Sequence, residues 1–388
     1  MSTVQSAAKT SENRSLSGKE DPFDRERIAS INGPLLSWYY LHARKLPWRD
    51  DPSAYHVWVS EIMLQQTRVE AVKPYYARFL NALPSIADLA ACPEEKLLKL
   101  WEGLGYYSRV RNMKKCAQVL TEHFDGQLPG EYDALIRLPG IGSYTAGAIS
   151  SIAFHNPVPA VDGNVLRVIS RVISCEEDIL LPSVKARTEA ALRETIPKEE
   201  AGAFNQALMD LGAGICLPSA KGTVRARCSE CPLNEVCLSY QKDIVDRIPV
   251  RIIKTRRSVQ EKTVLVISDG VRAVLGKRKN KGLLAGMYEL PNLNGKCSEE
   301  DVIRFVQEIG VSPLRVQSLP DTSHMFTHLE WKMSGYSILA EDLEDTAHLK
   351  EPYMIVETGR IGTDYAIPSA FRAFTAYLAY SSTSARQP

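Results

Sequence analysis

Leu138-Pro-Gly-Ile-Gly-Ser-Tyr-Thr-Ala-Gly-Ala-Ile149 places a proline and two glycines directly before a run of helix-forming residues. The residues on both sides, 131–137 and 143–154, have the composition and spacing of helices. Because glycine adopts φ > 0 without steric cost, Gly140 and Gly142 predict a tight hairpin between two helices. The free N–H groups at a helix start can bind an anion such as phosphate. An ordinary turn between helices has the same kind of sequence, so other segments are needed to tell a phosphate-binding hairpin from a plain turn.

The composition bounds the class of protein. A chain of 388 residues with 44% hydrophobic and 24% charged residues predicts a globular protein of two domains. No apolar run approaches the roughly 20 residues of a membrane helix, and the first 25 residues lack the hydrophobic stretch of a secretory signal. We therefore expect a cytoplasmic, nucleoid-associated location. Residues 1–25, rich in Ser, Lys and Glu, are expected to be disordered.

The charge is unevenly distributed although the net charge is only +1. The segment Lys221–Arg257 contains nine basic and four acidic residues. Such a segment can neutralise phosphates, or it can be a solvated basic linker.

Hydrophobic periodicity changes character near Pro249. Before it the pattern is helical, most clearly over 57–80 and 201–211. After it, β-rich runs at 264–267 and 271–275 flank a turn signal at 268–270, and a further β-rich region covers 325–339. Helical patterns cover 299–309 and the stretch from 369. The prediction is a multidomain chain: an all-α domain (26–242), a basic linker (243–261) and a smaller α+β domain (262–383).

Four of the eight cysteines fall within 22 residues, in the spacing C-x11-C-x2-C-x5-C. They are Cys216, Cys228, Cys231 and Cys237. In a chain without a secretion signal this pattern indicates a metal site rather than disulfides, and four thiolates suit zinc or a four-iron four-sulfur cluster equally. The scattered cysteines 92, 116, 175 and 297 are interpreted as small hydrophobic residues.

Several segments together resemble the MutY-type adenine DNA glycosylases. Besides the hairpin and the four-cysteine loop they are WVSEIMLQQT (58–67), WEGLGYYSR (101–109), AVDGNVLRV (160–168) and FNQALMDLG (204–212). The segment SHMFTHLEW (323–331) resembles that family's second domain. The resemblance implies an all-α helix-hairpin-helix glycosylase domain with an iron-sulfur loop, followed by an α+β Nudix-like domain. It also implies a monofunctional DNA N-glycosylase of base excision repair that acts as a monomer on duplex DNA containing an adenine:8-oxoguanine mispair.

The resemblance assigns the chemistry to two carboxylates. Breaking a glycosidic bond needs an acid for the leaving base and an anion for the sugar cation. Glu61, in an apolar helical setting that favours the protonated acid, is implied to protonate adenine. Local sequence alone presents Asp162 as a helix N-cap. The resemblance implies that it acts on the sugar cation, as electrostatic stabiliser or transient nucleophile, with Asn164 orienting it. Tyr144 stands where strand-cutting relatives of the endonuclease III type carry a lysine, so we expect no strong lyase step.

The remaining implied residues contact the DNA or the cluster. A duplex hides its bases, so adenine must be flipped into a pocket. The resemblance places Gln66 and Tyr106 in the helix beside the lesion, with Gly140 and Gly142 on phosphate. It assigns Gln206, Trp48 and Arg49 to the adenine pocket; Phe326, Thr327 and His328 to 8-oxoguanine; and one 4Fe-4S cluster to Cys216, Cys228, Cys231 and Cys237.

Two departures from the family pattern stand out. Eleven residues separate the first two cysteines where the family usually has six, and Thr327 replaces the more common serine but keeps the hydroxyl. The longer loop, with Lys221, Arg225 and Arg227, either contacts DNA or weakens the cluster; we favour the first, because ligation needs the cysteines and not a fixed loop length.

Three alternative activities share parts of the pattern. The Nudix-like part lacks the glutamate-rich metal box, which argues against nucleotide hydrolysis. A non-catalytic iron-sulfur DNA-binding protein would not need the two carboxylates. The runner-up is a glycosylase-lyase for oxidised pyrimidines. Activity on adenine opposite guanine stays open.

Overall fold

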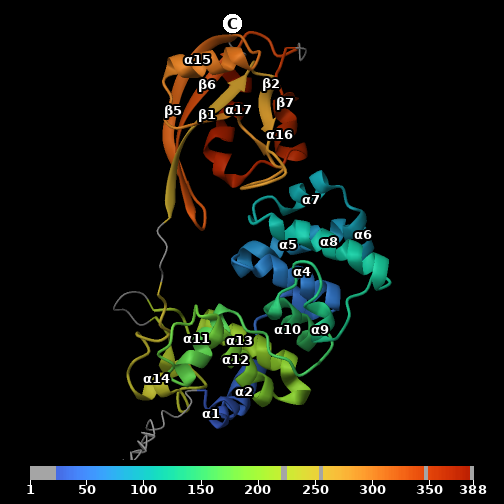
Figure 1. The fold of residues 1–388 in the computed structure, drawn as a ribbon, viewed down its shortest axis with the longest axis vertical. Helices are drawn as coiled ribbons and strands as arrows, with labels where there is room; N and C mark the ends of the chain where they lie inside the picture. Colours follow the sequence, from blue (N-terminus) through green and yellow to red (C-terminus); the bar gives the residue numbers. More distant parts are fainter. Residues whose placement is uncertain (1–22, 220–224, 253–256, 345–347, 385–388) are drawn as a thin grey trace, which may run out of the picture. The chain divides into compact units, whose positions relative to one another are not determined.

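The computed structural model describes residues 23–219, 225–252, 257–344 and 348–384 (Figure 1). The chain forms two compact units, each built from two separate stretches. Unit 1 comprises Met1–Arg44 and His155–Ile252, and unit 2 comprises Lys45–Phe154 and Ile253–Pro388. Within the described ranges, no helix has both the length and the apolar character needed to cross a bilayer.

Unit 1 is helical, and residues of both of its stretches pack into it. Buried side chains of α1, α2, α11, α12 and α13 form one apolar core. Arg44 binds Asp210 of α13 through its Nε, 2.6 Å from Oδ1, and so ties the end of the first stretch to the second. The elements are α1 (Arg25–Ser30), α2 (Asn32–His42), α11 (Gly163–Val172), α12 (Pro182–Thr195), η1 (Lys198–Glu200), α13 (Ala201–Gly214), η2 (Cys228–Glu230) and α14 (Leu238–Gln241).

The helical part of unit 2 has its own core, which includes Trp58, Phe79 and Trp101. The periodicity over 57–80 predicted helix throughout, but the structure has two helices separated by a turn at residues 65–68. The turn contains neither glycine nor proline, so local sequence gives no signal for it. The elements are α3 (Pro47–Asp50), α4 (Ala54–Leu64), α5 (Val69–Ala82), α6 (Ile86–Ala91), α7 (Glu94–Trp101), α8 (Ser108–His123), α9 (Tyr132–Leu135) and α10 (Ser143–Ile152).

The predicted hairpin is present between α9 and α10. Gly140 has φ +77°, and a Cβ there would lie 2.6 Å from Cβ of Asn112, so backbone and space both require glycine. Gly142 differs from the prediction: it is the N-cap of α10 with φ −95° and open space around it. Only the first glycine therefore needs the left-handed conformation.

The C-terminal part of unit 2 is a seven-stranded mixed sheet with the strand path β3-β2-β1-β6-β5. Strands β1 and β6 pair in parallel, and the other pairs are antiparallel. The predicted hairpin joins β1 to β2, whereas the long strand β5 was not predicted, because its residues are mostly polar and include Pro320. The strands are β1 (Ser258–Ser268), β2 (Arg272–Lys277), β3 (Tyr288–Glu289), β4 (Asn292–Asn294), β5 (Pro313–Met325), β6 (Leu329–Ala340) and β7 (Tyr353–Glu357).

Helices cover both faces of this sheet (Figure 1). Because side chains alternate along a strand, Val264 and Val266 face one core, with Phe371 and Phe374, while Leu265 and Ile267 face the other. The second core includes residues of α15. This arrangement matches the predicted α+β domain. The helices are α15 (Glu299–Glu308), α16 (Thr358–Asp364), η3 (Ser369–Phe371) and α17 (Arg372–Ser384).

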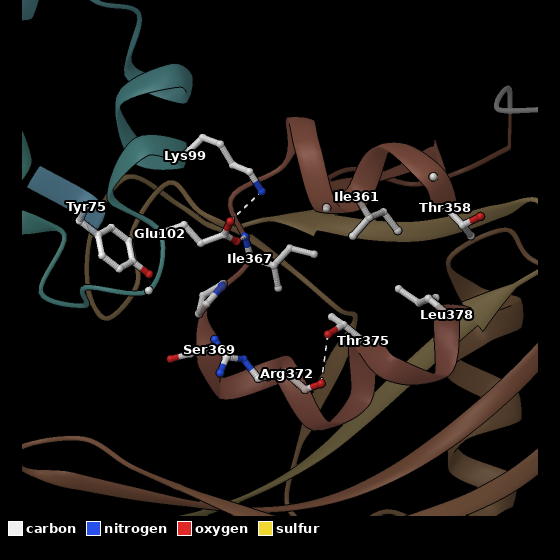
Figure 2. A pocket seen from close by; sticks show the side chains of 14 residues that line it. Tyr75, Lys99, Glu102, Thr358, Ile361, Ile367, Ser369, Arg372, Thr375 and Leu378 are labelled. Carbon is white, nitrogen blue, oxygen red and sulfur yellow. Dashed lines mark hydrogen bonds and ion pairs between the residues drawn. The ribbon is translucent and has the colours of Figure 1, made fainter. Parts of the chain in front are cut away.

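Helix α7 joins the helical part of unit 2 to the C-terminal part. Glu95 accepts hydrogen bonds from Lys277 and from the Tyr288 hydroxyl. Glu102, ion-paired with Lys99, accepts the backbone N–H of Ile367 at 2.8 Å. Beside these contacts lies an open cavity of about 590 Å³ between α7 and the segment α16–η3–α17, lined by side chains of both (Figure 2). These contacts hold the sheet against the helices that carry the motif residues of unit 2.

The boundaries of the predicted linker and tail differ in detail. Residues 1–22 of the predicted disordered segment lie outside the described residues. Of its last three residues, Phe23 is buried and Arg25 begins α1, so these belong to the folded unit. Strand β1 begins at Ser258, so the last four residues of the predicted linker belong to the sheet.

Candidate functional site

The hairpin presents the N-terminus of α10, which has no side-chain cap. Its first turn contains Ser143 and Tyr144 and no acidic residue. The positive end of the helix dipole is therefore not neutralised by a carboxylate within that turn. An anion such as a DNA phosphate would complement this end.

Glu61 lies on α4 with its side chain in the interior, and the residue is only 5% exposed. The Tyr144 hydroxyl, from α10, donates a hydrogen bond of 2.5 Å to Oε2 of Glu61. The structure thus joins two residues that the sequence singled out separately, 83 positions apart. The setting is apolar, since the neighbouring residues Val57, Trp58 and Ile62 are all buried. A carboxyl held here by one phenol is suited to acid–base work.

The two residues predicted to enter the DNA helix share an unusual backbone. Gln66, in the turn after α4, has φ +58°, and Tyr106, before α8, has φ +47°. Residues other than glycine rarely adopt this region, and such strain concentrates at functional positions. Both side chains are exposed, Tyr106 to 44%. They are free to meet a ligand.

The turn between β5 and β6 carries the three residues predicted to read 8-oxoguanine. Phe326 packs edge-on between His324 and Trp331, with ring centroids 4.7 Å and 4.9 Å away, while Thr327 and His328 are exposed. The Thr327 hydroxyl contacts the Tyr106 hydroxyl through a hydrogen bond in which either oxygen can be the donor. The predicted wedge and the predicted lesion-reading turn therefore meet inside unit 2.

Asp162 in unit 1 is the N-cap of α11, as its local sequence predicted. Its Oδ1 accepts the backbone N–H groups of Asn164 and Val165 at 2.9 Å and 2.8 Å. Its Oδ2 accepts Nδ2 of Asn164 at 2.8 Å. Arg167 donates from Nη2 to Oδ1 of Asn164 at 2.9 Å, which leaves the amide nitrogen facing the carboxylate. Asn164 thus orients Asp162, and Arg167 orients Asn164.

Burial raises the pKa of the Asp162 carboxyl above its usual value. The hydrogen bonds from Val165 and Asn164 and the charge of Arg167 oppose that shift without overcoming it. A helix N-terminus favours an ionised carboxylate, but here burial outweighs that preference. The site holds a carboxylate that lacks its full solvation and would gain from a nearby cation.

The four clustered cysteines line one pocket, together with Arg171 and Tyr240. No three of the described histidine, cysteine, aspartate and glutamate side chains are grouped so as to hold a single metal ion. Four thiols around one pocket are a donor set that either a zinc ion or an iron-sulfur cluster can use. The donor set consists of thiols only, which is the set that iron-sulfur clusters use.

Burial raises the pKa of the Cys231 thiol to about 12 and that of Cys237 to about 11. Backbone N–H groups that donate to these two sulfurs oppose the shift. Arg171, 1% exposed, donates from Nη1 to Sγ of Cys216 at 3.2 Å. Such donors stabilise thiolates that ligate a metal. Sequence reasoning missed Arg171 and Arg167, although both lie on the α11 face that Asn164 begins, at helical spacing.

The eleven-residue segment between Cys216 and Cys228 closes at its base. The Arg227 backbone N–H donates to the Ile215 carbonyl at 3.0 Å, and its guanidinium donates to the Gly214 carbonyl. Cys228 is thereby returned to the neighbourhood of Cys216 despite the long loop. Lys221 lies outside the described residues, and Arg225 is exposed.

The three residues predicted for the adenine pocket lie in different surroundings. Trp48 is buried in the helical core of unit 2, edge-on to Tyr76 at 5.4 Å. Arg49 is half-buried beside it on α3, and Gln206 is half-buried on α13 of unit 1. Their role stays a prediction.

Residues 59–198 match the family described as "HhH-GPD superfamily base excision DNA repair protein", and residues 263–377 match "NUDIX domain". The chain is 32% identical to the adenine DNA glycosylase of Mus musculus, covering 87% of this chain and 76% of that protein. It is 35% identical to the adenine DNA glycosylase of Buchnera aphidicola subsp. Baizongia pistaciae, covering 76% and 82%.

Among solved structures, a non-covalent endonuclease III–DNA complex matches with a TM-score of 0.48 and 25% identity, over 57% of this chain and 98% of that one. The shared length and identity with the curated relatives are decisive: the chain belongs to the adenine DNA glycosylase family and is a DNA N-glycosylase of base excision repair.

Proposed function

We propose that the protein excises adenine paired with 8-oxoguanine in duplex DNA, by hydrolysis and without cutting the strand. The observation that carries this proposal is the buried Glu61 carboxyl with the Tyr144 hydroxyl on its Oε2. It places an acid beside a residue that cannot form a Schiff base, because a phenol lacks the amine that lyase chemistry needs.

The reaction begins when Glu61, in its acid form, gives its proton to a ring nitrogen of the flipped adenine. The C1′–N9 bond then breaks, and its electron pair leaves with the base. The sugar carries the positive charge as an oxocarbenium ion. A water molecule adds to C1′ and gives up a proton, which returns Glu61 from the carboxylate to its acid form. Tyr144 keeps the Glu61 carboxyl oriented throughout, since its hydroxyl holds one of the two oxygens.

Asp162 stabilises the sugar cation in this proposal. Its carboxylate is fixed by three donors and is incompletely solvated, so a positive charge that develops nearby is favoured strongly. Asn164 and Arg167 prevent the carboxylate from rotating away. The stabilisation exists before the reaction starts, which is what electrostatic catalysis requires.

Recognition of the opposite base rests on the turn that holds Thr327. The contact of Thr327 with Tyr106 links the residue that reads 8-oxoguanine to the residue that wedges the duplex. Phosphate is held at the start of α10 by the hairpin that contains Gly140 and Gly142. The protein acts as a monomer in the cytoplasm, on nucleoid DNA.

The test is single-turnover cleavage of duplexes with adenine opposite 8-oxoguanine, guanine or thymine, developed with and without alkali. We expect strand breaks only after alkali, fastest opposite 8-oxoguanine and absent opposite thymine. Breaks without alkali would show a lyase step and contradict the role of Tyr144. Excision of an oxidised pyrimidine instead of adenine would establish the glycosylase-lyase alternative.

We further propose that the cysteine pocket holds one 4Fe-4S cluster through Cys216, Cys228, Cys231 and Cys237. Bound there, the cluster cross-links the loop to the end of α13 and so contributes to folding of unit 1. The Arg171 side chain and the backbone N–H donors would stabilise the sulfurs once they are deprotonated as ligands.

Cys237→Ser is expected to remove most of the iron from the purified protein, because serine oxygen is a poor ligand for this cluster. The measurement is iron and acid-labile sulfide per chain, with the visible absorbance of the chromophore. Cys297→Ser is the matched control, since Cys297 lies in the C-terminal part of unit 2. Stoichiometric zinc in the wild-type protein, or full iron in Cys237→Ser, would refute the assignment.

A further inference from the structure

Arg109 occupies the first turn of α8, a position that does not favour a cation. The positive end of a helix dipole repels a guanidinium, and α8 has no acidic residue in its first turn to compensate. Burial lowers the pKa of Arg109 to about 10, with Tyr106 opposing the shift. Burial and the helix dipole both disfavour the charged guanidinium of Arg109 at this position. Its hydrogen bonds to backbone carbonyls explain why an arginine stands there.

The guanidinium joins two separate loops through five backbone carbonyls. Nη1 donates to the carbonyls of Ile62, Met63 and Gln65 at 2.6, 3.2 and 2.7 Å. Nη2 donates to the carbonyls of Leu104 and Gly105 at 3.0 and 3.1 Å. The first group is the end of α4 and the turn that leads to the first wedge residue. The second group belongs to the loop that leads to the other wedge residue, Tyr106.

Two of these five carbonyls lie in the last turn of α4. The last four carbonyls of a helix have no acceptor role inside it, and α4 ends at Leu64, so Ile62 and Met63 belong to this set. The guanidinium therefore caps the helix that carries Glu61. It also lies over the rings of Trp101 and Tyr106, at 5.3 and 5.5 Å from their centroids. One side chain thus touches the acid-bearing helix and both wedge loops.

Both loops need such support because both are strained. Gln66 and Tyr106 are in the left-handed region, where the Cβ of a residue other than glycine crowds the following carbonyl oxygen. Gly103 and Gly105 also have positive φ, at +102° and +69°. A loop of this kind relaxes unless surrounding contacts fix it. A wedge that must order itself on DNA would spend binding energy that base flipping requires.

We propose that Arg109 is a positioning residue that holds Gln66 and Tyr106 as one preformed wedge and aligns it with the end of the Glu61 helix. The inference rests on the proposed function, because it takes these two residues to enter the duplex. Arginine is required rather than lysine, since one ammonium cannot reach five carbonyls in two loops with the planar geometry of a guanidinium.

The first test needs no DNA. Arg109→Lys keeps the charge, and we expect amide hydrogen exchange in peptides covering 62–68 and 102–108 to become about tenfold faster, because these backbone segments lose their common anchor. Arg78→Lys is the control: Arg78 lies on α5 over the Tyr75 ring at 4.5 Å and contacts neither loop. Equal exchange in Arg109→Lys and the wild type would overturn the proposal.

The second test is a mutant cycle in single-turnover excision. Arg109→Lys is expected to slow excision about 10- to 100-fold when Gln66 and Tyr106 are present, as a misplaced group does. In the Gln66→Ala/Tyr106→Ala background its effect should fall below about threefold, because coupled residues are not additive. The same loss in both backgrounds would assign Arg109 to general folding and overturn the proposal. Failure of the wild type to excise adenine contradicts the proposed function instead, while the exchange experiment still decides the role of Arg109.

Discussion

Glu61→Gln is expected to slow excision of adenine by about 10² to 10⁴-fold in single turnover, the usual contribution of a general acid. Glutamine fills the same volume and its amide oxygen still accepts the Tyr144 hydroxyl, so the local packing of α4 and α10 should survive. Only the transferable proton is removed. The rate of base release, developed with alkali, measures the effect.

The control for this substitution is Glu70→Gln on α5, because Glu70 is exposed and pairs with Lys73 only three residues away. It should leave the rate unchanged, and binding of the mispaired duplex should persist in both variants. Excision by Glu61→Gln within a few-fold of the wild type would show that another group protonates the base.

Asp162→Asn is expected to slow excision by about 10² to 10³-fold, the typical cost of losing one preorganised electrostatic group. Asparagine remains a good N-cap, so α11 should still form. The variant lacks the negative charge that would face the sugar cation. Wild-type rates in this variant, with the duplex in saturating amount, would rule out the proposed role.

Although Asp162→Asn is expected to slow the reaction, it should make the folded protein more stable than the wild type as the pH rises. The pKa of Asp162 is higher in the folded protein than in the unfolded chain, so the wild type loses stability as the pH rises from the unfolded value through the folded one. Asparagine does not titrate. The melting temperature of Asp162→Asn relative to the wild type should therefore rise between about pH 3 and neutrality. Asp301→Asn should show the reverse trend, because bonding to Ser298 lowers the pKa of Asp301.

The parts that the sequence could predict are those that short segments encode. The hairpin was predicted from a proline followed by glycines, and Gly140 does have positive φ in the structure. The N-cap role of Asp162 was predicted from its place before an amphipathic run. The family likeness singled out Glu61, Tyr144, Tyr106 and Thr327, and the structure joins the first two and the last two by hydrogen bonds. Pattern and likeness therefore identified the residues without giving their contacts.

Contacts between distant segments could not be predicted from one sequence. The residues of the turn 65–68 have a helical pattern in the sequence. In the structure Arg109 binds the Gln65 carbonyl, and Arg109 belongs to a helix that begins at Ser108, 43 positions after Gln65. The direction of the Asp162 pKa depends on burial, which arises only when unit 1 is packed. In both places tertiary structure overrides a local preference.

The division of each unit into two stretches sets an order of events during synthesis. Helices α1 and α2 leave the ribosome before the helices on which they pack. Those partners, α11, α12 and α13, begin more than 100 residues later in the chain. Arg25 reaches Glu194 across 169 positions and Arg27 reaches the Val236 carbonyl across 209. The apolar residues of α1 and α2 that are buried in the finished fold, such as Ile28, Ile31 and Leu35, therefore stay exposed on the nascent chain until the later helices are made. Nascent chains paused near residue 150 should need chaperone protection that chains released past residue 252 no longer require.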